Sequence, residues 1–249
     1  MPLTFSHPAI VLPLNYLPKR WVSLTGLIVG SVVPDFEYFI RMKVFSIYSH
    51  TWAGLFWFDL PMAILLTFVY HDILRASFLN NLPNALHMRF SQFNKFNWNQ
   101  YFVQNVPVVI ISILIGGASH LFWDSFTHIN GYFVVKWSMA GQASLFGMQI
   151  PLYKMIQHIS TIVGGAVIIV VICRMTVEKI SKSGKLWPYW FIAIGIALVV
   201  VALRLLFGLS FHQYWNILVT AISGTILGVI LASMWYQIRK SLDSDFYII

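Results

Sequence analysis

The chain has 249 residues, of which 58% are hydrophobic and only 10% are charged, and its formal net charge is +8. A soluble globular domain carries about 25% charged residues, so this composition excludes one and indicates an integral membrane protein. The basic residues lie in short connections between apolar runs and not along one face, which argues against nucleic acid as a partner. The single cysteine, Cys173, excludes an intramolecular disulfide.

The amino-terminal part of the chain is expected to be irregular and then to form a short helix. Four prolines in the first twenty residues each remove a backbone donor, so one regular helix cannot form there. Trp21 to Val33 is apolar, but it is shorter than the ~20 residues that a membrane span needs. Gly26 and Gly30 favour close packing against another helix. We expect a half-helix that carries Asp35 beyond its end.

Five longer apolar runs predict five membrane spans: Trp52 to Ile73, Val106 to Thr127, Met155 to Cys173, Trp187 to Phe207 and Tyr214 to Ile238. We expect a polar connection at 75–104 and an aromatic loop at 130–153 that caps the bundle in the membrane interface. The predicted fold is an all-α polytopic membrane helix bundle. It forms a single domain over 1–249, in which 1–51 contributes site residues and 52–249 forms the bundle.

Positive charge predicts the orientation of the chain. It concentrates at 75–95, at 174–185 and at Arg239-Lys240. These are alternate connections, so the positive-inside rule places them in the cytoplasm together with the carboxyl terminus. The amino terminus and the loop at 130–153 then lie on the outer face of a cell (inner) membrane.

The second predicted span ends in three potential metal ligands at four-residue intervals, His120, Asp124 and His128. On a helix this spacing puts them on one face, and such a polar stripe must face protein or water and not lipid. Imidazole nitrogen and carboxylate oxygen are ordinary ligands of zinc. The alternative is a set of polar positions that hold helices together, and this stretch alone does not separate the two.

The predicted topology brings further ligands to the same outer boundary. His50 precedes the first span and His158 opens the third, while His7 and Asp35 join them if the short helix does not cross the membrane. We therefore expect a divalent metal, preferably zinc, held by several helical segments. The predicted ligands are His7, Asp35, His50, His120, Asp124, His128 and His158, and the candidate catalytic residues are Asp35 and Asp124.

Two other carboxylates have local explanations. Glu37 lies four residues before Arg41, which favours an ion pair, although Glu37 is also close enough to Asp35 to stand beside the site. Asp59 lies inside the first span and must point into the bundle, because a carboxylate facing lipid is costly.

The remaining histidines are expected to be unrelated to the site. His71 lies beside Asp72, and Asp72 precedes Arg75 by three residues, which predicts a local ion pair at the end of the first span. His87 and His212 lie in connections and are expected to be solvated.

Four segments together resemble a known family: Pro2-Leu-Thr-Phe-Ser-His7-Pro8, Gly30-Ser-Val-Val-Pro34-Asp35-Phe-Glu37-Tyr38, Ser49-His50-Thr51 and His120-Leu-Phe-Trp-Asp124-Ser-Phe-Thr-His128. The family is an uncharacterised bacterial membrane family, domain of unknown function 4184. The resemblance covers most of the chain and implies no activity.

The order of histidines and aspartates is also distantly similar to membrane-bound metal-dependent hydrolase-like proteins and to the zinc-dependent phospholipase C superfamily. This similarity implies one zinc site of Asp35, His50, His120 and Asp124, a second that uses His128 and His158, and a third at His7 that Asp124 bridges. Two positions depart from that pattern. Met1-Pro2 stands where those enzymes use an amino-terminal tryptophan, and Ile162 stands where they have a glutamate. A site for one or two metal ions is therefore expected.

Three functions fit these observations. The sequence has no GxSxG elbow, phosphate-binding glycine loop or HExxH motif, which argues against a serine or cysteine nucleophile. The first function is a metal-dependent hydrolase of phosphate esters at the outer face, with a membrane lipid or a lipid-linked molecule as substrate. The second is an ion or proton-coupled transporter with Asp59 and Asp124 in its path. The third is a non-catalytic membrane scaffold. The clustering of ligands at one boundary favours the hydrolase.

Overall fold

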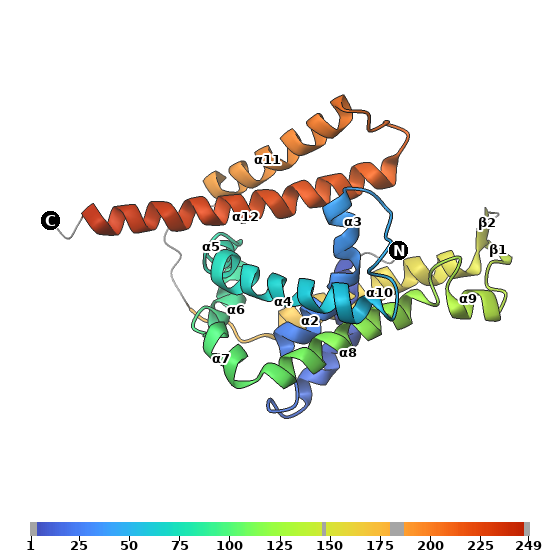
Figure 1. The fold of residues 1–249 in the computed structure, drawn as a ribbon, viewed down its shortest axis with the longest axis horizontal. Helices are drawn as coiled ribbons and strands as arrows, with labels where there is room; N and C mark the ends of the chain where they lie inside the picture. The colour runs from blue at the N-terminus through green and yellow to red at the C-terminus, as the bar shows by residue number, and fades with distance from the viewer. Residues whose placement is uncertain (1–3, 146–147, 180–186, 247–249) are drawn as a thin grey trace. The chain divides into compact units, whose positions relative to one another are not determined.

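The computed structural model describes residues 4–145, 148–179 and 187–246, which are almost entirely helical (Figure 1). The elements are η1 Thr4–Ser6, α1 Pro8–Val11, η2 Leu12–Tyr16, α2 Leu24–Val32, η3 Val33–Asp35, α3 Phe36–Arg41, η4 Leu55–Asp59, α4 Leu60–Phe68, η5 Val69–Leu74, α5 Arg75–Asn80, α6 Asn84–Phe90, η6 Ser91–Phe93, α7 Trp98–Gln104, α8 Val106–Asp124, α9 Tyr132–Lys136, β1 Gln142–Leu145, β2 Met148–Pro151, α10 Leu152–Arg174, α11 Trp187–Leu206 and α12 Tyr214–Phe246. The predicted all-α class is confirmed, since the described strands form one short hairpin.

Five helices within the described ranges are long and apolar enough to cross a membrane. They are Leu55–Asn80, Val106–Asp124, Leu152–Arg174, Trp187–Leu206 and Tyr214–Leu242. The five predicted spans are therefore confirmed, and the chain is a membrane protein. Helix α2 has nine residues and is too short to cross, which confirms the expected half-helix.

The first span contains two π-helical turns, η4 and η5, on either side of α4. Leu55, Asp59, Ala63, Thr67 and His71 are all buried, at intervals of four residues. In a regular α-helix, side chains four residues apart point in directions that differ by about 40° around the helix axis. The wider π turns offset this rotation and keep the series on one face. Asp59 is 0% exposed, so the prediction that it points inward is confirmed.

The chain forms two compact units. The first contains the residues up to Phe36, Ile47–Leu65 and Phe102–Arg174, and the second contains Glu37–Ser46, Leu66–Tyr101 and the residues from Met175 onward. The site residues predicted from the sequence all belong to the first unit.

In the first unit, α2 packs closely against α8 through glycines on both helices. A methyl group on Gly30 would overlap the backbone of Ile113, and one on Gly116 would overlap the backbones of Leu27 and Ser31. The predicted role of the Gly26-x3-Gly30 spacing in close packing is thus confirmed. This approach brings the carboxyl end of α2 against the last turns of α8, where His120 and Asp124 lie.

The aromatic loop predicted at 130–153 contains the short helix α9 and the strands β1 and β2. The peptide N–H groups of Phe133 and Val134 in α9 both donate to the carbonyl of Ser125, at 3.1 and 3.3 Å. Val134 is fully buried and packs with Met139 and Tyr153. Strands β1 and β2 then pair antiparallel, with Gln142 opposite Pro151. The burial of Val134 and these backbone hydrogen bonds stabilise α9 and the hairpin. The mixed composition of this segment has no clear periodicity, so the sequence did not predict these elements.

In the second unit, α11 and α12 form a helical hairpin whose arms lie side by side (Figure 1). Gly228 of α12 lies against the backbone of Ala193, which leaves no room for a side chain and allows close packing of the two helices. The hydroxyl groups of Tyr189 and Ser233 are 3.0 Å apart in this interface. The two helices therefore pack through small residues and one buried polar pair.

The connection at 75–104 is also ordered, as α5, α6, η6 and α7, which corrects two predictions. Arg75 donates a hydrogen bond of 3.0 Å to Nδ1 of His71 and does not pair with Asp72 as predicted. The π-helical turn η5 aligns His71 with Arg75, which lies four residues later. Arg75 therefore pairs with His71 and not with Asp72, which precedes it by three residues.

The second correction concerns His87, which is buried in the same connection. It is only 5% exposed, and its Nδ1–H donates to the carbonyl of Leu79 at 2.9 Å. The expectation of a solvated His87 is wrong because α6 folds back on α5. His212 is exposed, as predicted.

Candidate metal centre

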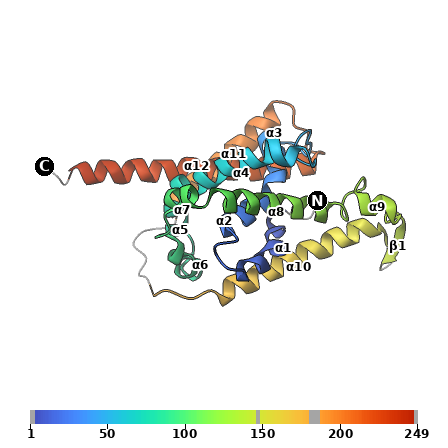
Figure 2. The same cartoon turned by 60° about the horizontal axis from the view of Figure 1, so that its bottom comes forward.

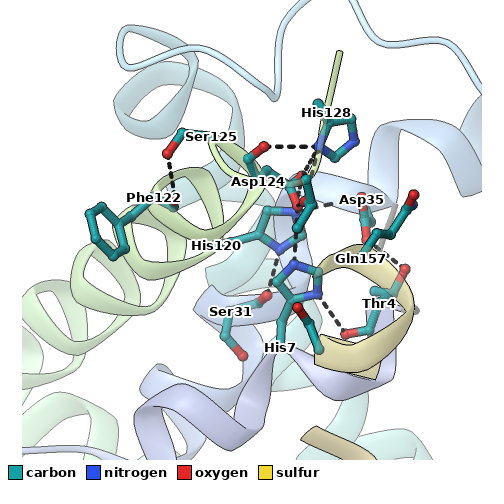
Figure 3. Close-up of polar contacts among 12 residues, drawn as sticks. Thr4, His7, Ser31, Asp35, His120, Phe122, Asp124, Ser125, His128 and Gln157 are labelled. Carbon is teal, nitrogen blue, oxygen red and sulfur yellow. Dashed lines mark hydrogen bonds and ion pairs between the residues drawn. The ribbon is translucent and has the colours of Figure 1, made fainter. Parts of the chain in front are cut away.

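Three histidines and two aspartates of the first unit, His7, His50, His120, Asp35 and Asp124, meet at the end of α8. Figure 3 labels all of them except His50. Asp35 ends the short turn η3, which forms where Pro34 interrupts the helix that begins at α2. His7 follows η1, His50 lies in the turn before the first span, and His120 and Asp124 occupy the last turns of α8. Asp35 and His120 are fully buried, and His7 and Asp124 are 4% and 6% exposed.

Four donor atoms of this group lie close together, two histidine nitrogens facing two aspartate oxygens. Nε2 of His50 lies 3.4 Å from Oδ1 of Asp35 and 3.6 Å from Oδ2 of Asp124. Nε2 of His120 lies 3.6 Å and 3.3 Å from the same two oxygens. Four ligands bound tetrahedrally at about 2.0–2.2 Å stand about 3.3–3.6 Å from one another. The four nitrogen–oxygen separations therefore match edges of a tetrahedral zinc site.

Three of these four atoms are buried polar atoms without a hydrogen bond among the described residues: Oδ1 of Asp35, Nε2 of His120 and Oδ2 of Asp124. An unsatisfied buried polar atom costs about 1–3 kcal/mol. Three such atoms that face one another satisfy their bonding capacity if a cation lies between them. The residues present thus fit a metal ion in both chemistry and geometry.

The opposite ring nitrogens of the histidines are anchored, which decides where their lone pairs point. Nδ1–H of His120 donates to the carbonyl of Ser31 at 2.8 Å, and Nδ1–H of His7 donates to the carbonyl of Thr4 at 3.3 Å. Nδ1 of His50 lies 3.0 Å from the hydroxyl of Ser49. A neutral histidine whose Nδ1–H donates to a carbonyl, as in His7 and His120, presents the lone pair of Nε2. A lone pair and a carboxylate oxygen repel each other unless a proton or a metal ion lies between them.

The electrostatics of the site also favour a bound positive charge. Burial lowers the pKa of His50, but the adjacent carboxylates of Asp124 and Asp35 outweigh it and raise this pKa to about 9. Burial raises the pKa of Asp35, but the neighbouring imidazoles of His120 and His50 outweigh it and lower this pKa below its usual range. The two charges of a divalent cation would balance Asp35 and Asp124, with the histidines neutral.

His7 and His128 lie beside these four ligands. The ring of His7 stacks on that of His120, with centroids 3.8 Å apart, and its Nε2 lies 3.4 Å from Oδ1 of Asp124. Nδ1 of His128 lies 3.1 Å from the carbonyl of Asp124 and 3.5 Å from Oδ2. The side chain of His128 is 31% exposed and that of His50 is 17% exposed. The cluster is therefore open on the side of these two histidines.

The structure does not bring His158 into the cluster. His158 is exposed on α10, and no ion pair or hydrogen bond in the described ranges joins it to the other ligands. Neighbouring residues on a helix point about 100° apart, and Figure 3 draws Gln157, the residue before it, beside Thr4. The sequence places His158 at the right membrane boundary but does not determine the direction of its side chain.

Glu37 belongs to the second unit, where it forms the predicted local pair. Its Oε1 lies 2.7 Å from a guanidinium nitrogen of Arg41. This contact resolves the choice left open by the sequence in favour of the ion pair.

Sequence reasoning missed the groups that anchor the histidines. Thr4 and Ser31 act through backbone carbonyls, which no residue pattern reveals. Ser49 adjoins His50 in the sequence, and this adjacency is the only signal that could have pointed to one of them.

Comparison with known proteins gives a family without an activity. The sequence model of a family described as "Domain of unknown function (DUF4184)" matches residues 1–234. No curated protein and no solved structure matches the chain.

Proposed function

We propose that this chain, which belongs to the family described as a domain of unknown function (DUF4184), is a metal-dependent hydrolase of phosphate esters. It would act at the membrane face where α8 ends. The observation that carries the proposal is that Nε2 of His50 and Nε2 of His120 each lie 3.3–3.6 Å from the same two carboxylate oxygens, one of Asp35 and one of Asp124. Two nitrogens and two oxygens form a typical ligand set for zinc.

The ion would be held by these four residues. When bound, it would lower the pKa of a coordinated water to about 7 and polarise a phosphoryl oxygen. Hydrolysis then adds water to phosphorus, breaks the ester P–O bond and releases the alcohol with a proton. Because no protein nucleophile is needed, the absence of a serine or cysteine motif from the sequence agrees with this chemistry.

The roles of the carboxylates follow from their contacts. Oδ1 of Asp35 faces the two ligand histidines, and Oδ2 accepts a hydrogen bond from Thr4 at 2.5 Å. With both oxygens engaged, Asp35 is better placed as a ligand than as a catalytic residue, the two roles that the sequence suggested for it. His128 lies on the open side and its Nε2 has no hydrogen bond among the described residues, so we assign proton transfer to it.

The surroundings of the site support a substrate at the depth of lipid headgroups. Consecutive spans end at Asp124 and begin at Leu152, so the segment between them lies at one membrane boundary. In that segment the rings of Phe126 and Phe133 stack 4.2 Å apart, and Trp137 is 57% exposed beside them. Exposed aromatic side chains prefer the interface between headgroups and hydrocarbon. A phospholipid or lipid-linked phosphate ester would thus reach the open side of the site.

We infer from the positive-inside pattern that this boundary lies on the outer face of the membrane. Basic residues cluster at 75–95 and 174–185, in the connections at the opposite ends of the spans. Reporter fusions at Asn80 and Ser144 test the orientation. A periplasmic signal at Asn80 would reverse it.

Activity is tested with protein purified without a histidine tag and loaded with zinc. We expect it to release alcohol or phosphate from phospholipid or lipid-linked phosphate esters in mixed micelles, and to lose this activity with a chelator. Asp124→Ala should be inactive, while His212→Ala, an exposed histidine of the second unit, should retain the wild-type rate. A zinc-loaded wild type that cleaves no phosphate ester in such a panel contradicts the proposal.

A transporter is the second candidate, because Asp59 is fully buried inside the first span. A carboxylate at this depth often marks an ion or proton path. Ion or proton flux in proteoliposomes that disappears in Asp59→Asn would favour this candidate. Hydrolysis without such flux would favour the hydrolase.

A further inference from the structure

Thr4 contacts two residues of the metal centre through two different groups. Its hydroxyl donates a hydrogen bond of 2.5 Å to Oδ2 of Asp35, and its carbonyl accepts one of 3.3 Å from Nδ1–H of His7. The side chain of Thr4 is buried, at 6% exposure, and the residues that it links are distant in the sequence. One short helical turn, η1, therefore orients both an aspartate and a histidine.

This turn is held from two sides. Ser6 lies against Gly164 of α10, where an added methyl would come within 2.9 Å of both the Cβ and the carbonyl oxygen of Ser6. His7, directly after the turn, stacks on His120 of α8 (Figure 3). Figure 2 shows α1 beside α10, in agreement with their contacts. The position of Thr4 is thus determined by packing and not only by its hydrogen bonds.

We propose that Thr4 is a positioning residue of the metal centre, which fixes Asp35 as a ligand through one oxygen. This inference rests on the metal site of the proposed function. The hydroxyl holds Oδ2 of Asp35 away from the donor group, so Oδ1 alone faces His50 and His120. Without the hydroxyl, the carboxylate is able to rotate and offer both oxygens to the ion. The ligand would then change its geometry, and Oδ2 would lose a buried partner.

The test compares Thr4→Val, which removes the hydroxyl at nearly constant volume, with Thr4→Ser, which retains it. Each protein is titrated with Co²⁺ as the probe, and affinity is measured by competition with a chelator. We expect Thr4→Val to bind Co²⁺ about 10–100-fold more weakly, as other losses of an outer hydrogen bond to a ligand do. The visible absorption of bound Co²⁺ should also change, because it reports the coordination geometry. Thr4→Ser should restore both values.

Thr225→Val is the matched control, since the hydroxyl of Thr225 donates to the carbonyl of Ala221 in its own helix, far from the site in the sequence. It should match the wild type. Thr4→Ala provides a second test of the missing hydroxyl if Thr4→Val does not fold. Equal affinity and an equal spectrum in the wild type and Thr4→Val overturn this inference alone. A folded wild type that binds no divalent ion overturns the proposed function and this inference together.

Discussion

Buried histidines occur in both units, but their surroundings differ. In the first unit, Nδ1 of His7 and of His120 donates to a carbonyl, and Nε2 points at a carboxylate. In the second unit, Nδ1 of His71 accepts a hydrogen bond from Arg75, and Nδ1–H of His87 donates to the carbonyl of Leu79. In the described part of the chain, the groups of residues that could hold a metal all lie in the first unit. Burial alone therefore does not make a histidine a candidate ligand, whereas convergence on carboxylates does.

The largest expected effect separates these two kinds of buried histidine. His120→Ala and Asp124→Ala should lose the zinc, from about one equivalent or more in the wild type, because each removes one of four ligands. They should also melt at a lower temperature, since saturation at 100 times Kd stabilises a folded protein by about 2.7 kcal/mol. Elemental analysis and thermal melting in detergent measure both quantities.

His87→Ala is the control for that experiment. It leaves the carbonyl of Leu79 without its donor, so it should lower stability by about 1–3 kcal/mol while retaining the zinc. Loss of zinc from His87→Ala at a temperature where the protein is folded would contradict the distinction between the two units.

The second prediction concerns pH. At neutral pH the metal-free site is protonated on His50, whose pKa is raised to about 9, so binding of a metal must release this proton. Zinc affinity should therefore rise by about tenfold per pH unit between pH 7 and 9. Chelator competition at several pH values measures the slope. A slope of zero would show that His50 is not a ligand.

The stability of the metal-free protein should change in the opposite direction. The raised pKa of His50 means that the folded state binds its proton more tightly than the unfolded state does. This contribution is fully present below pH 6.5 and is lost as the pH rises through about 9. The melting temperature of chelator-treated protein should fall over this range, and His50→Gln should flatten that part of the curve.

The third prediction compares two histidines that the sequence treats as equivalent. His128 contacts Asp124 at the open side of the cluster, while His158 is exposed and outside it. His128→Ala should reduce hydrolysis by about 10²-fold, the typical contribution of a general base. His158→Ala should leave the rate and the metal content unchanged. Loss of zinc from His158→Ala would place this residue among the ligands.

The smallest effect is expected at a pair of adjacent glycines on α10. A methyl on Gly164 would press on Ser6 and shift the turn that carries Thr4, whereas no atom lies within 4 Å of a methyl on Gly165. Gly164→Ala should weaken Zn²⁺ binding severalfold, less than the roughly 10–100-fold expected when a hydrogen bond to a ligand is lost completely. Gly165→Ala should retain wild-type affinity and gain up to ~1 kcal/mol of helix stability. Equal Zn²⁺ affinities in the two variants would show that η1 does not depend on its contact with α10.

The sequence alone determined the membrane class, the five spans and the stripe of His120, Asp124 and His128. These features follow from composition, from the length of apolar runs and from helical spacing, all of which are local. It also placed His7, Asp35 and His50 at the boundary where α8 ends, because alternate connections of a helix bundle lie on the same side of the membrane.

Only the tertiary structure decided which of these residues meet and through which atoms. It left His158 outside the cluster, buried His87, formed α9 and the hairpin of β1 and β2, and revealed Thr4 as a partner of Asp35. The direction of a side chain and the distance between segments depend on how helices pack, here on the close approach of α2 and α8 at Gly30 and Gly116. The spacing of residues along the chain does not reveal that approach. The sequence alone therefore does not distinguish a histidine of the cluster from a histidine outside it.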